Sequence, residues 1–247
     1  MHSDLFRLCD ILRRRNIRVT VLSTGLLLER HAQAIVANVD DVIVSLDGPR
    51  EVHNRIRRVP GAFEKLALGV RSIRKLRPDF PINARCTIQR LNHAHLRETI
   101  AEARELALNG ISFLAADLTS TAFNRPSGWT LDRQMSVELD REEIPALESE
   151  IESIVCENEC RGFVAESPEK LRKIVRHFRA HLGDAEPVAP LCNAPWVSVV
   201  VESDGVVRPC FFHRSIGNLR QTPLQTIVAR NRATLFLGTG PAALPWL

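Results

Sequence analysis

Hydrophobic positions in the first half of the chain follow two alternating spacings, one typical of strands and one typical of helices. Runs of β-branched and other apolar residues predict strands at residues 17–22, 41–46, 82–88 and 111–115. Apolar positions three or four residues apart predict amphipathic helices before the first strand and between successive strands. Because strands that alternate with helices form right-handed βαβ units, we expect an α/β fold with a parallel sheet.

The alternation ends near Asn124, and the Arg-Pro-Ser-Gly sequence that follows is typical of a linker. The later elements are expected to be helices at 144–156 and 168–181, a β-hairpin of 197–201 and 206–210, and a closing helix at 222–230. We therefore expect three parts: residues 1–125, a pair of linker helices within 126–189, and a small α+β extension at 190–247.

The composition is ordinary for a globular protein, with 45% hydrophobic and 25% charged residues among 247, enough for one large domain or two modest ones. No apolar run approaches the roughly 20 residues that cross a bilayer, and the amino-terminal residues do not resemble a signal peptide. The net charge of +4 is a weak signal for nucleic acid, because aromatic residues make up only 5% and tyrosine is absent. We expect a cytoplasmic protein that binds neither membranes nor nucleic acid.

Polar residues gather where the predicted strands end, which is where parallel sheets carry their chemistry. Ser45 and Asp47 lie two positions apart, so both would face one side if the strand stays regular. Gly25 and Gly48 would allow the backbone to approach a ligand closely. A hydroxyl beside a carboxylate suits a ribose or an amino acid, although a turn that is merely polar also fits this pattern.

Six cysteines occur in a chain without an export signal, which favours free thiols or metal ligands over a disulfide framework. Cys192 and Cys210 flank the predicted hairpin, a geometry common in metal knuckles, and buried structural thiols are the alternative. Cys156 and Cys160 lie four residues apart, on one face of a helix if the helix extends that far. They are either additional ligands or incidental thiols.

Two groups of segments resemble a known family. Residues 17–25, 42–49, 53–57 and 60–63 are similar to the central part of a radical S-adenosylmethionine (SAM) domain. Residues 192–195, 204–210 and 216–219 are similar to the start of the SPASM or Twitch extension, which holds auxiliary iron–sulfur clusters. These matches span roughly residues 4–125 and 190–232, in the order that the family has them.

The resemblance implies a partial (β/α)6 barrel in which a [4Fe–4S] cluster binds SAM. An electron donor reduces the cluster, SAM is cleaved to a 5′-deoxyadenosyl radical, and the radical abstracts hydrogen from a peptide or small metabolite. By resemblance Ser45 would contact SAM with Asp47 nearby, Thr24 would border the same pocket, and Arg85 or Gln89 would reach the SAM carboxylate. Cys192 and Cys210 would be ligands of an auxiliary cluster. No residue of this chain is expected to be catalytic.

The chain also departs from the family pattern. It contains neither the CxxxCxxC sequence that holds the catalytic cluster nor the Gly-Gly-Glu-Pro sequence that grips SAM, and no cysteine follows Cys210. Ser23-Thr24-Gly25 stands where the family has Thr-Asn-Gly. We therefore expect a fragment that lacks both ends of its parent and is inactive alone. The strand at residues 17–22 would then be an unpaired edge, which predicts marginal stability or aggregation.

Two other functions fit the same residues. The first is a non-catalytic module, derived from the same fold, that binds a nucleotide-like ligand or a peptide at the strand ends. The second is an α/β binding protein stabilised by zinc on Cys156, Cys160, Cys192 and Cys210.

Overall fold

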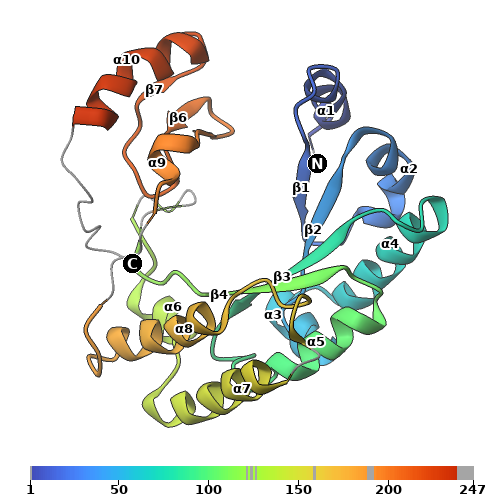
Figure 1. Cartoon of the computed structure of the whole chain (residues 1–247), viewed down its shortest axis with the longest axis vertical. Helices are drawn as coiled ribbons and strands as arrows, with labels where there is room; N and C mark the ends of the chain where they lie inside the picture. The colour runs from blue at the N-terminus through green and yellow to red at the C-terminus, as the bar shows by residue number, and fades with distance from the viewer. Residues whose placement is uncertain are drawn as a thin grey trace. The chain divides into compact units, whose positions relative to one another are not determined.

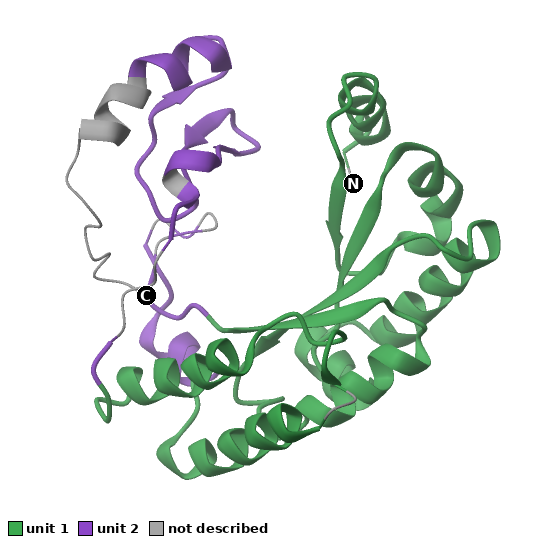
Figure 2. Cartoon of the chain, in the orientation of Figure 1, with its two compact units in different colours: residues 1–116, 137–185 green, residues 117–136, 186–247 purple. Residues whose placement is uncertain are grey.

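The computed structural model of the chain describes residues 2–120, 122, 125, 127–157, 160–187 and 192–237. It forms two compact units, shown in Figure 2. Unit 1 consists of Met1–Ala116 and Val137–Ala185, and unit 2 of Asp117–Ser136 and Glu186–Leu247. The segment expected to link the two ends of the chain, residues 126–189, therefore contributes to both units.

Unit 1 is built on a four-stranded parallel sheet with the strand order β1-β2-β3-β4 (Figure 1). The strands are β1 (Thr20–Ser23), β2 (Asp41–Ser45), β3 (Ile82–Ile88) and β4 (Gly110–Ala115). Every neighbouring pair is parallel. The predicted α/β class and parallel sheet are confirmed, and each predicted strand matches an observed one.

Seven α-helices in the described part of unit 1 connect or cover these strands. They are α1 (Leu5–Arg13), α2 (Leu28–Asn38), α3 (Arg50–Arg57), α4 (Ala62–Leu76), α5 (Leu96–Glu105), α7 (Ile144–Cys156) and α8 (Pro168–His181), with a short 3₁₀ turn η1 (Arg141–Glu143) before α7. Figure 1 shows α2, α4 and α5 along the same side of the sheet. None of the helices in the described part of the chain is both long enough and apolar enough to cross a membrane.

The two faces of the sheet differ in burial. Side chains of Val42, Val44 and Leu46 are fully buried under the helices. The alternate positions point to the other side, where Leu22 is 61% exposed and Leu114 is 38% exposed. We call the first side the covered face and the second the open face.

The sheet continues past β4 through an extended segment, residues 163–166. Val164 pairs with Ile111 in a parallel bridge. The Ile111 N–H donates to the Phe163 carbonyl oxygen and the Ala165 N–H to the Ile111 carbonyl oxygen, both at 2.9 Å. This pairing covers the outer edge of β4. At the other side of the sheet β1 is the edge strand, and the marginal stability expected from such an edge stays a prediction.

Unit 2 contains a small antiparallel sheet of β5 (Val200–Val201), β6 (Val206–Arg208) and β7 (Gly217–Asn218). Three helices accompany it, α6 (Leu131–Met135), α9 (Ala194–Val197) and α10 (Leu224–Leu237). The predicted hairpin is present with shorter strands, and residues 194–197 before it form a helical turn that has Pro195 near its start. The third strand had no counterpart in the prediction.

Candidate functional site

Two of the predicted site residues are neighbours on the open face. Ser45 lies directly opposite Arg85 in the β2–β3 register, and Arg85 lies opposite Ser112 in the β3–β4 register. The Nε of Arg85 donates to Ser112 Oγ at 3.3 Å. All three residues are half-buried. They form a polar row across three strands, which we call the Ser45–Arg85–Ser112 row.

Thr24 and Gln89 lie beyond the carboxyl ends of β1 and β3. Thr24 is exposed, whereas Gln89 is half-buried and its N–H donates to Asn92 Oδ1 at 2.8 Å. Both residues therefore stand at the edge of the sheet where the parallel strands end. Among the described residues, no hydrogen bond connects either of them to the Ser45–Arg85–Ser112 row, and their ligand contacts stay predictions.

The position of Asp47 corrects one expectation, that its carboxylate shares the open side with Ser45. Strand β2 ends at Ser45, so the regular alternation stops before Asp47. The Asp47 side chain is only 3% exposed, and its Oδ2 lies 2.5 Å from Arg57 Nη2. The carboxylate thus points into the packed interior of unit 1, where it cannot meet a ligand on the open face.

Asn92 connects the ends of β2 and β3, a role that the sequence interpretation missed. Its buried Nδ2 donates to the carbonyl oxygens of Asp47 at 2.8 Å and Thr87 at 3.0 Å. Its Oδ1 accepts the Gln89 N–H at 2.8 Å. An asparagine four residues after a predicted strand end is a signal for such a side-chain-to-backbone turn, and it could have been recognised.

His53 fixes the same strand tip from the other side. The ring is fully buried, and its Nδ1 accepts the Asp47 N–H at 3.2 Å, which places the proton of the neutral ring on Nε2. Burial, with a smaller contribution from the charge of Arg57, lowers the pKa of His53 to about 4. Burial also raises the pKa of Asp47, and the Arg57 guanidinium opposes that effect. The backbone after Ser45 is therefore held by buried polar groups, not by solvent.

Gly48 completes this rigid tip. A Cβ at this position would lie 2.6 Å from Val52 Cγ1 and 2.8 Å from Val52 Cβ, closer than real side chains approach. The missing side chain of Gly48 thus allows α3 to pack closely, and its predicted close approach to a ligand stays a prediction.

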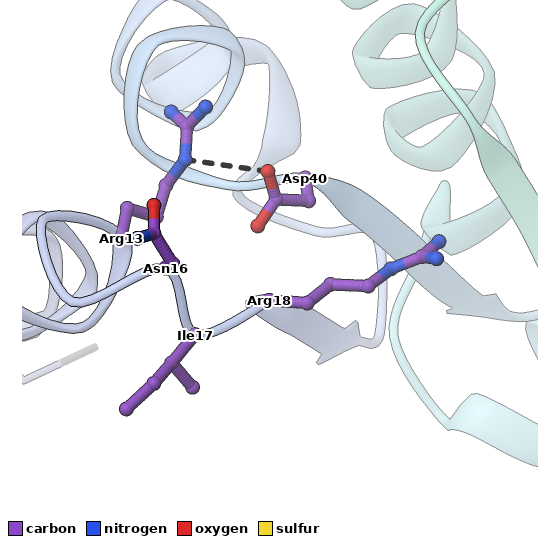
Figure 3. A pocket seen from close by; sticks show the side chains of 5 residues that line it. All are labelled: Arg13, Asn16, Ile17, Arg18 and Asp40. Carbon is purple, nitrogen blue, oxygen red and sulfur yellow. Dashed lines mark ion pairs between the residues drawn. The ribbon is translucent and has the colours of Figure 1, made fainter.

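A pocket of about 480 Å³ lies at the opposite end of the sheet, beside the amino ends of β1 and β2 (Figure 3). Arg13, Asn16, Ile17, Arg18 and Asp40 line it. Arg13 Nε lies 3.3 Å from Asp40 Oδ1, and Arg18 pairs with Asp41 at 2.9 Å. The charged groups of its lining already form these ion pairs. The pocket therefore has little unpaired charge with which to bind a charged ligand.

The cysteines of unit 2 have features that suit metal binding. Cys210 is half-buried, and burial raises its pKa. Backbone hydrogen bonds from Phe212 and His213 lower that pKa, and the charge of the exposed Cys192 raises it. The charge of Cys192 therefore acts on the Cys210 thiol, and two backbone N–H groups donate to the Cys210 sulfur. Thiolates are the usual ligands of iron–sulfur clusters, so this pair fits part of a cluster site.

The other cysteines belong to unit 1. Cys156 is exposed at the end of α7, and Cys160 is buried with its Sγ 3.6 Å from Glu157 Oε2. Cys9 and Cys86 are buried in the core. Among the described residues there is no group of three or more His, Cys, Asp or Glu side chains arranged to hold a metal ion. The zinc site on four cysteines therefore receives no support from the described part of the chain.

Parts of the chain are similar to known proteins. The family model SPASM, which describes an iron-sulfur cluster-binding domain, matches residues 192–244. An AdoMet-dependent heme synthase of Methanosarcina barkeri is 32% identical over 106 residues, covering 42% of this chain and 30% of that protein. An Fe-coproporphyrin III synthase of the same organism is 25% identical over 243 residues, covering 92% of this chain and 58% of that protein.

Solved structures share the fold. Native anSMEcpe with bound AdoMet matches with a TM-score of 0.60 at 19% identity, covering 93% of this chain and 62% of that one. The same protein with AdoMet and the Cp18Cys peptide matches with a TM-score of 0.61, covering 93% of this chain and 64% of that one.

The parallel sheet and its strand-end residues define the class: part of a barrel-type α/β protein with a separate cysteine-bearing extension. The SPASM match and the curated relatives then support the predicted resemblance to radical SAM/SPASM superfamily proteins, and the solved structures share the fold of this chain. The chain spans 30% and 58% of the lengths of the curated relatives it matches.

Proposed function

We propose that this chain provides the SAM-binding strand ends and part of an auxiliary cluster site in a radical SAM/SPASM iron–sulfur enzyme. The observation that carries the proposal is the Ser45–Arg85–Ser112 row on the open face of a parallel sheet, in a chain that also matches the SPASM model. Parallel α/β sheets bind their ligands at the carboxyl ends of the strands, which is where Ser45 lies.

Several residues of this chain would contribute to the binding of SAM. Arg85 would bind the carboxylate of SAM through its terminal nitrogens, since only its Nε has a hydrogen bond among the described residues. Ser45 would donate or accept a hydrogen bond next to it, with Thr24 and Gln89 at the rim. Asp47 would act indirectly, by fixing the strand tip on which Ser45 stands.

Cys192 and Cys210 would hold an auxiliary iron–sulfur cluster as thiolates. No residue is assigned to the catalytic cluster, because the sequence contains no CxxxCxxC. When bound, SAM and its cluster supply hydrogen-atom abstraction from a substrate, with one electron delivered by a donor protein or reductant.

The substrate would be a peptide or a small metabolite. The peptide is supported by the fold shared with anSMEcpe, whose solved complexes include the Cp18Cys and Kp18Cys peptides. The metabolite is supported by relatives named for heme and Fe-coproporphyrin III synthesis. The alignment with the second relative covers 92% of this chain, which favours the metabolite.

Anaerobic reconstitution with iron and sulfide tests the cluster part of this proposal. We expect the chain to retain iron and sulfide, and the double variant Cys192→Ser, Cys210→Ser to lose both. Cys156→Ser is the matched control, because this thiol is exposed on the other unit. Equal iron retention by the double variant would contradict the assignment, and no iron in any of them would favour a non-catalytic binding module. Zinc retained after aerobic purification would favour the zinc-stabilised alternative.

A further inference from the structure

Large apolar side chains are exposed in unit 2 along the two segments that meet next to Cys210. Ser198 Oγ lies 2.8 Å from the Pro209 carbonyl oxygen, so the end of α9 stands beside the end of β6 (Figure 1). A surface that has no partner usually carries such residues singly, whereas a group of them marks an interaction site. The exposed apolar residues of the two segments are Trp196, Val197, Val199, Phe211 and Phe212, with exposed fractions from 37% to 72%. We call these five residues the apolar patch.

Cys210 lies within the apolar patch. Phe211 and Phe212 follow it directly in the chain, and Ser198 on the neighbouring segment stands between Val197 and Val199. Cys210 itself is half-buried. Apolar side chains next to a redox ligand control the access of solvent to it. The patch therefore surrounds the point at which an electron would reach a cluster bound to this thiolate.

The charge of this part of the chain is positive. Residues 192–237 contain five arginines and two acidic residues, a net charge of +3. Arg214 follows Cys210 by four positions, and Arg220 packs over the β5–β6 turn, where its Cγ would lie 3.2 Å from a Cβ at Gly205. Both arginines are exposed, and neither forms an ion pair within the described residues. We call Arg214 and Arg220 the basic rim.

An apolar centre with a charged rim is the usual composition of a protein–protein interface. The sign of the rim selects the partner, because a positive surface attracts an acidic protein and repels a basic one. A second copy of this chain suits the patch poorly, since it would bring the same net positive charge against the rim. The charge thus favours an acidic protein over self-association.

We propose that the apolar patch and the basic rim bind a small acidic electron-transfer protein. The inference rests on the proposed function, because the electron would pass to the cluster on Cys192 and Cys210. In that step the donor is oxidised by one electron and the cluster is reduced by one electron, and no bond forms or breaks. The rim would steer the donor to the surface, and the patch would bring its redox group close to Cys210. Such encounters bury little area and dissociate readily.

A bacterial flavodoxin, which is an acidic electron carrier, is the probe, and its binding to the full chain is measured by isothermal titration at low and at physiological salt. We expect the double variant Arg214→Glu, Arg220→Glu to weaken binding by about tenfold and to remove most of its salt dependence. Phe211→Ser should weaken binding by about tenfold and leave the salt dependence unchanged.

The matched controls lie on unit 1. Arg30→Glu, Arg71→Glu reverses two exposed arginines of α2 and α4, and Leu68→Ser removes an exposed apolar side chain of α4. Both controls should bind flavodoxin as the unmodified chain does.

The inference is wrong if the unmodified chain does not bind flavodoxin. It is also wrong if both unit 2 variants stay folded by circular dichroism and bind within about twofold of the unmodified chain. Basic cytochrome c that binds as tightly as flavodoxin would overturn it, and so would a single-stranded oligonucleotide that binds more tightly and is lost in the arginine variant. Flavodoxin binding by a chain that retains no iron after reconstitution would support the docking surface and contradict the proposed cluster site.

Discussion

The two faces of the parallel sheet differ in what covers them, and β3 shows the contrast most clearly. Its residues Ile82, Ala84, Cys86 and Ile88 are almost completely buried on the covered face. Asn83, Arg85 and Thr87, which alternate with them, are half-buried on the open face. One strand therefore carries a close-packed core on one side and hydrogen-bonding groups on the other.

The comparison shows which face of the sheet stabilises unit 1 and which face is available to bind a ligand. The covered face buries apolar side chains beneath the helices, and such packing supplies most of the free energy of folding. The open face contributes less burial and keeps polar groups available for a ligand. Substitutions on the two faces should therefore have effects of different kinds.

The largest expected effect is on the covered face. Leu46→Ala should lower the free energy of unfolding by about 3 kcal/mol, because it removes a fully buried side chain and leaves a cavity. Leu22→Ala is the matched control, since this leucine is 61% exposed on the open face, and should cost under about 1 kcal/mol. Urea denaturation followed by circular dichroism measures both. Equal losses in the two variants would remove the distinction between the faces.

The free energy of unfolding should also depend on pH because of His53, which is buried beside the end of β2. The expected change is similar in size to that of Leu46→Ala. Its pKa is lowered to about 4, whereas the unfolded chain binds the same proton near pH 6.5. The unfolded state therefore binds more protons between these values, so stability should fall as the pH falls from about 6.5 to about 4, by about 3 kcal/mol in total. The raised pKa of Asp47 has the opposite sign and acts at the acidic end of this window.

The measurement is the unfolding free energy at several pH values between 7.5 and 5, where ordinary carboxylates titrate little. His53→Leu should remove the slope in this range, even though its stability at neutral pH is lower. His95→Gln is the control and should retain the slope, because His95 lies at the surface near Glu98. A flat profile for the unmodified chain between pH 6.5 and 5 would show that His53 takes up its proton freely in the folded state.

Much of the fold could be predicted from the sequence, because the apolar residues follow clear strand spacing and clear helix spacing. The β-branched run at Ile82–Ile88 and the apolar stripe of α4 reflect burial on the covered face. The pattern was weaker at α3, where His53 is the only buried residue, so no apolar stripe indicated this helix. Helices that bury one polar residue lack the signal on which such predictions depend.

The site was less predictable, because its geometry depends on register and on contacts between distant segments. Ser45 was predicted from the strand end, but its direct pairing with Arg85 follows from the β2–β3 register. Asp47 was misplaced because the alternation of β2 was extended past Ser45, where the strand ends just before the Gly48-Pro49 stop.

A smaller effect is expected from Asn92, which connects the ends of β2 and β3. Asn92→Ala should cost about 2 kcal/mol of stability, because it leaves the buried Asp47 and Thr87 carbonyl oxygens and the Gln89 N–H without partners. Denaturation measures the loss, and Asn193→Ala at an exposed position is the control. If the tip positions Ser45, the variant should also bind S-adenosylhomocysteine more weakly at a temperature where it is still folded. Unchanged stability would mean that water replaces the amide.

The smallest effect is expected on the open face itself, at Ser112. Ser112→Ala removes the only described hydrogen-bond acceptor of Arg85 but no buried apolar contact, so stability should change by less than about 0.5 kcal/mol. The Arg85 side chain would then lose part of its orientation, and the affinity for S-adenosylhomocysteine should fall roughly threefold. Ser203→Ala, at an exposed turn, should change neither quantity. A stability loss above 1 kcal/mol with unchanged ligand affinity would mean that the row on the open face is structural, and that the contrast between the two faces is one of degree.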